Sequence, residues 1–393
     1  MGNRQSISVK EENKRKVIET LFSHNDITRQ GIIEKTGLAA STISGITADL
    51  IHQGMIRKIG SVANMGMGRK IDILTRVPDY DSVVSVSLTK ENCEISLVDF
   101  GLNTIAEESL PVDIVPDDSG SQRLIDAIGD FLRKQSGRKV SAVSLALPHH
   151  PYSWERIRKE LQRGLPLPFL MLNNVEAMAL SDHYRTRRGE EEGTLFYVFV
   201  GPGIGSALII DGHLHRGMNG WASDLGHIHI KDGGELCRCG RKGCLETVAS
   251  ENSLRAEMEK LTGERLDSPN TLIDAITKGF EERNQSVIEI LDSAADYLAE
   301  GLHTIISLLD PSRIVIISSL NRIRPYYSSL IEEKLYERFT SRSPFSVQRD
   351  YEDFERSSGV TGAALYAFLC LNTHPGRLLK PLQPQKPPLL TGS

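Results

Sequence analysis

The order of strand-like and helix-like segments occurs twice in this chain, and that repeat is the strongest constraint on its fold. The first half predicts strands at 83–88, 93–99 and 103–110, a helix at 121–135, a strand at 140–147 and helices at 154–162 and 176–184. The second half predicts strands at 195–200, 206–210, 213–215 and 314–317, and helices at 326–338 and 359–370. Alternating strands and helices are typical of an α/β fold. Two similar halves also predict a cleft between them, where small ligands usually bind.

Composition excludes several classes of protein. The 393 residues are 39% hydrophobic and 25% charged, which is ordinary for a globular chain and excludes collagen-like, disordered and disulfide-scaffold classes. The apolar runs are strand-sized, far shorter than the roughly 20 residues that span a bilayer. Residues 1–20 are charged and lack the apolar segment of a secretory signal. We therefore expect a cytoplasmic protein that does not insert into membranes.

The charge is divided unevenly along the chain. Residues 1–76 hold 12 Lys and Arg against 7 Asp and Glu, a net charge of +5, which leaves 34 against 44, or −10, for the rest. A basic module on an acidic body is typical of a nucleic-acid reader joined to a sensor or an enzyme. Chance unevenness is the alternative interpretation.

Residues 1–77 predict a small α+β domain. One helix starts near Thr28, a suitable N-cap, and ends at the turn Thr36-Gly37-Leu38. The next helix carries Ile43, Ile46 and Leu50 on one face, at helical spacings of three and four. Helix, glycine turn, helix is the helix-turn-helix pattern, whose second helix enters the major groove of DNA.

A hairpin with a glycine-rich tip follows these helices. Strands are expected at 55–59 and 71–74, joined by the segment 60–70. This arrangement predicts a wing, from which Arg69 would reach a minor groove. A plain surface turn is the alternative interpretation of the segment taken alone.

A histidine and three cysteines have the spacing of a metal site. Cys237, Cys239 and Cys244 lie within eight residues, and His227 precedes them. Thiolate and imidazole are ligands that Zn²⁺ favours, and four such ligands fill its shell, so the predicted zinc is structural. His229 competes with His227, because alternation along a strand points both the same way. Free thiols in a loop are the remaining alternative.

The quoted residues carry a resemblance to a known family. The run GMNGWASDLGHIHIKDGGELCRCGRKGCLETVAS at 217–250, preceded by GPGIGSALIIDG at 201–212, resembles the ROK family of sugar kinases and sugar-responsive repressors. The N-terminal helix-turn-helix, the phrase at Thr36 and the wing's Gly68-Arg69 resemble its repressor branch. The resemblance implies an actin-like, two-lobed body at 78–373, and it favours His227 over His229 as the zinc ligand.

The resemblance also implies a site for a sugar-like ligand. Side chains with carboxylate, amide and imidazole groups pair well with sugar hydroxyls. The matching positions are Asn173, Asn174, Asp224, His227 and Glu246. Ordinary surface hydrogen bonding is the alternative role for these residues.

Departures from the family pattern argue against a kinase. Family kinases use the Asp of an Asn-Asp pair as the base, but here the pair is Asn173-Asn174, and an amide cannot take the proton. The first phosphate-binding loop of the kinases contains an Asp and a Gly, but the matching residues 87–91 (SLTKE) contain neither. A Gly-Gly pair near the adenosine site of the kinases is matched here by Ser318-Ser319.

Two departures concern the ligand. The stretch 149–153 (HHPYS) is shorter than the family's sugar-contacting loop, and Asp224 replaces the usual Glu. The effector is therefore expected to be an unusual sugar derivative or sugar phosphate, or a protein partner, unless the site is vestigial.

The leading hypothesis is a homo-oligomeric DNA-binding regulator of carbohydrate-related genes, most simply a repressor and not an enzyme. It would bind palindromic double-stranded operator DNA as a homodimer or homotetramer. The residues expected to contact DNA are Arg29, Ser41, Thr42, Ser44, Lys58, Arg69 and Lys70. Because Ala39 occupies the usual cap position, the cap of the second helix shifts to Ser41 or is lost.

Two other functions remain alternatives, an ATP-dependent ROK sugar kinase and a zinc-stabilised scaffold. Residues 374–393 contain five prolines and few aliphatic residues beyond leucine, which predicts a disordered tail.

Overall fold

The structure is a computed structural model that divides into two compact units, residues 1–190 with 358–393 and residues 191–357. It describes residues 9–63, 70–89, 92–111, 120–135, 137–148, 154–186, 193–218, 220–323, 326–339, 347–352, 359–373, 376 and 378–380. Within these ranges, no helix is long and apolar enough to cross a membrane.

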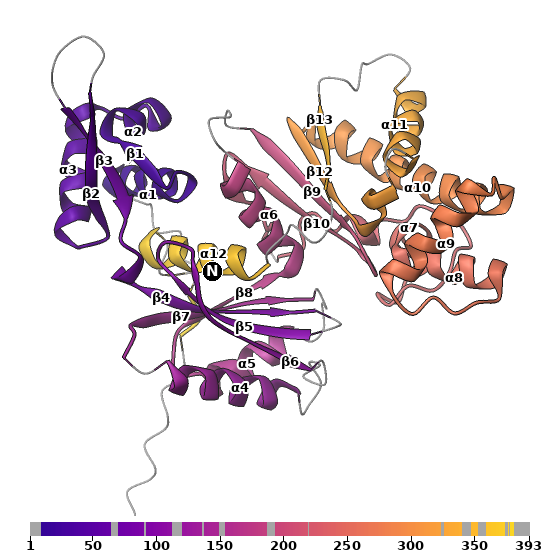
Figure 1. The fold of residues 1–393 in the computed structure, drawn as a ribbon, viewed down its shortest axis with the longest axis horizontal. Helices are drawn as coiled ribbons and strands as arrows, with labels where there is room; N and C mark the ends of the chain where they lie inside the picture. The colour runs from indigo at the N-terminus through magenta and orange to yellow at the C-terminus, as the bar shows by residue number, and fades with distance from the viewer. Residues whose placement is uncertain are drawn as a thin grey trace, which may run out of the picture. The chain divides into compact units, whose positions relative to one another are not determined.

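The N-terminal region has the mixed helix and strand content that the sequence predicts (Figure 1). Its elements are α1 (Val9–Ser23), β1 (Asp26–Thr28), α2 (Arg29–Thr36), α3 (Ala40–His52), β2 (Ile56–Ala63) and β3 (Lys70–Arg76). The strands form an antiparallel sheet in the order β1-β3-β2. Strand β1 was not predicted, because three residues are too few to show an alternating pattern.

Local capping explains where α2 begins and ends. The Thr28 hydroxyl accepts a hydrogen bond from the Gly31 amide at 3.0 Å, as an N-cap should. Gly37, with φ +65°, ends the helix in the left-handed conformation that glycine tolerates. Helix α3 begins after Ala39 with no side-chain cap, so of the two predicted outcomes the cap is lost.

The rest of the first unit is built on a five-stranded sheet in the order β6-β5-β4-β7-β8. A 3₁₀ turn, η1 (Pro78–Tyr80), leads into it. Its strands are β4 (Ser82–Leu88), β5 (Asn92–Asp99), β6 (Thr104–Pro111), β7 (Val140–Leu147) and β8 (Phe169–Asn173). Its helices are α4 (Gly120–Lys134), α5 (Trp154–Gly164), α6 (Asn174–Thr186) and the C-terminal α12 (Gly359–Thr373).

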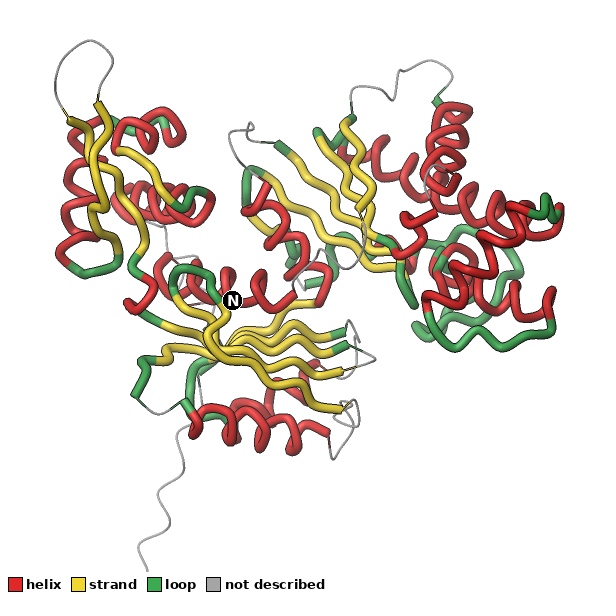
Figure 2. The backbone as a smooth tube through the Cα atoms, viewed as in Figure 1, coloured by secondary structure: helices red, strands yellow, loops and turns green. Residues whose placement is uncertain are grey.

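Strand alternation places different residues on the two faces of this sheet. Val84 and Val86 belong to a hydrophobic core with residues of α4 and α5. On the opposite face the Ser85 hydroxyl donates to the Val360 carbonyl of α12 at 2.7 Å. Figure 2 shows the sheet with helices on both sides.

The second unit contains a sheet of the same design. Its order, β11-β10-β9-β12-β13, repeats that of the first sheet, with three antiparallel strands followed by two strands that continue the sheet in parallel. The strands are β9 (Thr194–Val200), β10 (Ile204–Ile210), β11 (His213–Leu214), β12 (Arg313–Ile317) and β13 (Gln348–Glu352). The predicted duplication of an α/β half is therefore confirmed.

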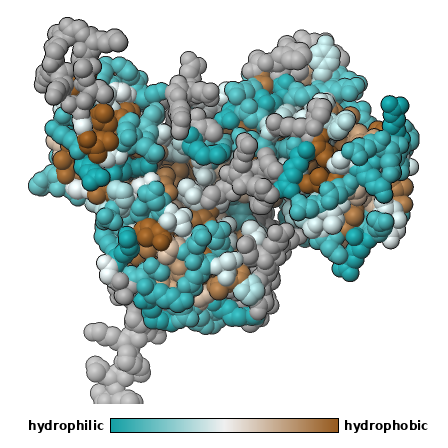
Figure 3. Space-filling model, in the orientation of Figure 1, coloured by the Kyte–Doolittle hydropathy of each residue, from teal (hydrophilic) through white to brown (hydrophobic). Residues whose placement is uncertain are grey.

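Helices cover a large apolar core in this unit. They are η2 (Leu225–His227), α7 (Glu246–Ala249), α8 (Glu251–Thr262), α9 (Pro269–Glu281), α10 (Gln285–Leu309), η3 (Ser319–Ile323) and α11 (Tyr326–Arg338). The long helix α10 packs against α7, α8, α9 and α11. On the face in view in Figure 3, hydrophilic residues predominate and hydrophobic ones form separate small areas.

Three further features differ from the sequence expectations. Strands β8 and β13 were not predicted. The predicted disorder of 374–393 does not hold for Leu379, which exchanges two backbone hydrogen bonds of 2.9 Å with Phe169 at the start of β8. Residues 374–375, 377 and 381–393 lie outside the described residues.

Two helical glycines of the first unit should respond oppositely to alanine. A Cβ at Gly362 would lie 1.7 Å from the Ala177 carbonyl oxygen, whereas a Cβ at Gly45 meets nothing within 4 Å. We expect Gly362→Ala to destabilise the unit by about 3 kcal/mol, as overpacking does. Gly45→Ala should stabilise it by up to about 1 kcal/mol through helix propensity. Urea unfolding followed by circular dichroism measures both, and equal effects would contradict the α6–α12 packing.

Candidate functional site

Helix α3 presents hydroxyl groups on its outer face. Ser41 and Ser44 are exposed and Thr42 is partly exposed, as the sequence predicts. The buried stripe is Ile43, Thr47 and Leu50, so Thr47 takes a place that the hydrophobic pattern gave to Ile46.

A polar cluster explains why Thr47 is buried. The Arg29 guanidinium donates to the Thr47 hydroxyl at 2.9 Å and to the Asp72 carboxylate at 3.4 Å. Lys58 lies 2.6 Å from the same carboxylate. The hydrogen bond from Lys58 and the two positive charges lower the pKa of Asp72. Arg29 and Lys58, predicted as DNA contacts, therefore hold α2, α3 and the β2–β3 hairpin together.

The other two basic residues predicted to contact DNA are Lys70 and Arg69. Lys70 is the first residue of β3, and its side chain lies outside the described part of the chain. Arg69 lies in the segment 64–69, which is also outside the described residues.

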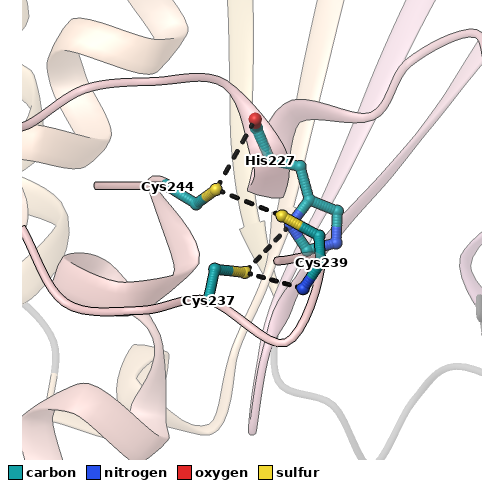
Figure 4. Close-up of side chains that lie close together, drawn as sticks. All are labelled: His227, Cys237, Cys239 and Cys244. Carbon is teal, nitrogen blue, oxygen red and sulfur yellow. Dashed lines mark hydrogen bonds between the residues drawn. The ribbon is translucent and has the colours of Figure 1, made fainter. Parts of the chain in front are cut away.

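The predicted metal ligands come together in the second unit. The ligand atoms of His227, Cys237, Cys239 and Cys244 all lie within 4.8 Å of one another (Figure 4). His227 comes from η2, and the cysteines come from the loop that precedes α7. His227, Cys237 and Cys244 are buried.

The distances within this group fit a tetrahedral zinc site. Cys239 Sγ lies 3.5 Å from Cys244 Sγ, and Cys237 Sγ lies 3.4 Å from His227 Nδ1. Ligands placed tetrahedrally about 2.3 Å (sulfur) and about 2.0 Å (nitrogen) from Zn²⁺ are roughly 3.5–3.8 Å apart. The set leaves no open position, so the chemistry it supports is structural.

His229 has a different environment. Its side chain is 56% exposed and its Nε2 lies 3.6 Å from Asp232. The backbone of His229 forms an isolated antiparallel β-bridge with Cys244. The cluster therefore contains His227 and not His229, in agreement with the choice that the resemblance favoured.

The thiols of the cluster need a cation to ionise together. Burial raises the pKa of Cys237 and of Cys244. Burial opposes ionisation of Cys239 as well, but hydrogen bonds from the Arg241 backbone N–H, from Cys237 and Cys244, and from the Arg241 side chain outweigh it and lower the pKa of Cys239. A metal would displace the remaining protons, which couples its binding to folding.

Glycines allow the chain to close around the cluster. Gly243 has φ +74°, and a Cβ there would lie 1.9 Å from the Lys231 carbonyl oxygen. Arg241 donates to the His227 carbonyl at 2.7 Å, which ties the cysteine loop to η2.

Glu246, a predicted ligand residue, is held by Arg238. Arg238 donates to both carboxylate oxygens of Glu246, at 3.0 and 3.2 Å. Glu246 is buried and accepts a hydrogen bond from Cys237 at 3.1 Å. A Cβ at Gly203 would lie 2.8 Å from the Glu246 carboxylate. Among the predicted residues, Glu246 and His227 are thus neighbours, with 3.8 Å between their Oε1 and Nδ1 atoms.

Asn173 and Asn174 lie where β8 meets α6, in the first unit. The Asn173 side-chain oxygen accepts from the Glu176 amide at 2.7 Å, and the Glu176 carboxylate accepts from the Asn173 amide at 2.8 Å. This reciprocal pair caps α6. Asn174 Nδ2 donates to the Leu88 carbonyl at 2.8 Å. Its side-chain oxygen is buried without a partner among the described residues, which leaves one acceptor for a ligand.

Asp224, His227 and Glu246 belong to the second unit, whereas Asn173 and Asn174 belong to the first. Asp224 immediately precedes η2, where its carbonyl accepts from the His227 amide at 3.2 Å while its side chain makes no capping hydrogen bond.

The segments matched to nucleotide-binding loops carry polar side chains. The Ser319 hydroxyl donates to the buried Glu251 carboxylate. Burial and that carboxylate raise the pKa of Tyr327, which is fully buried. Lys90, Glu91 and the shortened stretch 149–153 lie outside the described residues.

Comparison with known proteins gives one family and a consistent set of relatives. The model of the ROK family matches residues 144–368. An N-acetylglucosamine repressor of Escherichia coli O157:H7 is 25% identical over 386 residues, covering 92% of this chain and 94% of the relative. A xylose repressor of Caldicellulosiruptor bescii is 26% identical over 372 residues, covering 87% of this chain and 90% of the relative.

Solved structures share the fold. A ROK family transcriptional regulator, a homolog of the E. coli MLC protein, superposes with a TM-score of 0.74 at 20% identity and covers 94% of this chain. A ROK hexokinase from Thermus thermophilus has a TM-score of 0.61 at 22% identity. It covers 74% of this chain, although 99% of the hexokinase is matched. The predicted fold class is confirmed.

The metal cluster predicts a matched pair of variants. Cys239→Ser should lower the zinc content of the purified protein well below one per chain and lower its unfolding temperature, since a structural metal contributes folding energy. His229→Ala is the control, because His229 lies outside the cluster, and its zinc content should stay unchanged. Elemental analysis with thermal unfolding measures both, and loss of zinc in His229→Ala alone would contradict the ligand assignment.

Proposed function

Because the chain belongs to the ROK family, we propose that it is a transcriptional repressor of carbohydrate-related genes, with a body that senses a sugar-like effector. The main support is the extent of the similarity to repressors, which covers 92% of this chain in one case and 87% in another. About a quarter of the chain has no counterpart in the hexokinase, whereas the regulator structure covers 94% of it. The two repressor relatives support the prediction that the protein is not an enzyme.

The N-terminal region would be the DNA reader, a winged helix-turn-helix. Its net charge of +5 favours phosphate, and the exposed hydroxyls of Ser41 and Ser44 suit contacts at base edges or phosphates. Thr42 would contribute from the same helix. Arg69 would enter a minor groove and Lys70 would contact a phosphate, while Arg29 and Lys58 would contribute positive charge from their cluster with Asp72.

The body would bind the effector without catalysis. The unpartnered Asn174 oxygen suits a sugar hydroxyl as donor, but an amide cannot remove a proton from that hydroxyl. In the second unit, Asp224, His227 and Glu246 would contribute hydrogen bonds to the effector. One structural Zn²⁺ would hold His227 and the cysteine loop in place. Asn173, whose oxygen caps α6, would contribute through its amide nitrogen. Sugars, sugar phosphates and a protein partner remain the effector classes.

The assembly would be a homodimer or homotetramer acting on cytoplasmic DNA. A two-fold protein needs two half-sites about one helical turn apart or a multiple of that spacing. The operator is therefore expected to be palindromic.

Titration of the protein's own upstream DNA at two salt concentrations tests the DNA-binding proposal. We expect a sequence-specific complex that weakens with salt, and Arg69→Ala should weaken it about tenfold. Lys260→Ala removes an exposed positive charge from the second unit and should leave binding unchanged. Absence of sequence preference at either salt concentration rejects the proposal.

An assay coupled to ADP formation, with hexoses, pentoses and aminosugars as acceptors, tests the kinase alternative. We expect no turnover above background for the wild-type protein. Asn174→Asp, which restores a carboxylate at the base position, should also be inactive because the other nucleotide-site departures remain. Slow turnover that disappears in Asn174→Ala would establish a kinase.

A further inference from the structure

Helix α1 packs against two parts of the first unit. It contacts α2 and α3 in the N-terminal region and also contacts the C-terminal helix α12. Val17, Ile18 and Leu21 are buried, and so are Thr20 and Phe22 on neighbouring faces. A helix that serves one core buries a stripe about 100° wide, whereas these positions cover close to half of the helix circumference. Helix α1 is therefore shared between the DNA-reading region and the body.

Aromatic side chains form the contact. The Phe22 ring of α1 lies 5.1 Å from Phe100, in the turn after β5, and 6.0 Å from Phe368 of α12. Phe100 and Phe368 are themselves 5.2 Å apart, edge to face. All three rings are buried, so each would expose apolar surface if the region separated from the body.

A buried arginine fixes the orientation of this contact. Arg76, at the end of β3, is 5% exposed, and its guanidinium lies 4.8 Å from the centroid of the Phe22 ring. It donates to the Asn25 side chain at 2.9 Å, within the N-terminal region, and to the Gly101 carbonyl at 3.3 Å, within the body. Burial lowers the pKa of Arg76 to about 10. We call Phe22, Arg76, Phe100 and Phe368 the joint.

The joint is connected to the candidate ligand residues through two packed helices. Gly362 of α12 lies so close to α6 that a Cβ there would meet the Ala177 carbonyl oxygen at 1.7 Å. Helix α6 begins at Asn174, whose side chain is bonded to the Leu88 carbonyl of β4. A small displacement at the start of α6 must be taken up by α12, because two helices in backbone contact cannot slide without repacking.

We propose that the joint couples the amino end of α6 to the DNA-reading region. Operator DNA bound at α3 and a ligand bound at Asn174 would then change each other's affinity, with Arg76 acting as a positioning residue. The inference rests on the proposed function and adds the route by which the effector acts. By thermodynamic reciprocity, occupying the reader must affect α6 as much as occupying α6 affects the reader.

Hydrogen exchange of the full chain, with and without its upstream DNA, tests the coupling without knowledge of the effector. In the wild-type protein we expect DNA to slow exchange in α3, and also in α12 and α6 by about fivefold or more. In Arg76→Lys, which keeps the charge but loses the planar guanidinium over the Phe22 ring and the second donor nitrogen that bonds the Phe22 carbonyl, slowing should remain in α3 and disappear from α12 and α6. Phe100→Leu, which removes the ring contacts, should act in the same way and replaces Arg76→Lys if that variant fails to fold.

Arg138→Ala is the matched control, because it breaks an exposed ion pair with Asp79 in the same unit. It should behave as the wild type does. Slowing confined to α3 in the wild-type protein overturns the coupling while leaving the proposed function intact, and so does a joint variant that keeps the wild-type response. Absence of slowing in α3 as well, together with absence of DNA binding, overturns the proposed function and the coupling with it.

Discussion

The burial of α12 is the interaction on which the first unit depends. Every residue from Gly362 to Cys370 is buried, so this helix is apolar on all sides, as a helix at the centre of a domain must be. It packs against α1, α6 and the strands β4 and β7. The 167 residues of the second unit lie between α12 and the rest of the first unit in the chain. Packing α12 against α6 therefore closes a long loop, and the entropy lost in closing that loop opposes folding of the first unit.

The segment before α7 depends on a different constraint. Between β11 and α7 the only regular element among the described residues is the 3₁₀ turn η2. A few backbone hydrogen bonds, such as that from Ile230 to Gly243, hold the rest. Such a loop has little apolar surface to bury, so the three thiols and the imidazole must supply the cohesion that a sheet supplies elsewhere. Glu246 follows directly, and its position is therefore tied to the state of the cluster.

The sequence predicted the elements that have a strong pattern. Strand β7 and helix α11 match their predicted bounds, because both combine a clear period with clear ends. Strand β13 was missed since its sequence, QRDYE, is polar at an edge of the sheet. The metal ligands were predictable because their spacing is local. The pairing of Arg29 with Thr47 and Asp72, and the contacts of Phe22 and Arg76, were not, since they join residues far apart in sequence that no periodicity links.

The residues that hold the fold differ from those matched to kinase chemistry, so a kinase-like body can keep its fold without the catalytic groups. The sheets and α12 hold the fold through apolar contacts that do not involve Asn174 or Ser319. An amide in place of a carboxylate at Asn174 removes the proton acceptor. The amide nitrogen instead donates to the Leu88 carbonyl, a hydrogen bond that an ionised carboxylate could not make. At Ser319 the hydroxyl satisfies the buried Glu251, a charge that would otherwise be costly to bury. Absence of the carboxylate therefore leaves α6 and its contact with α12 intact, and the proposed coupling depends on that contact.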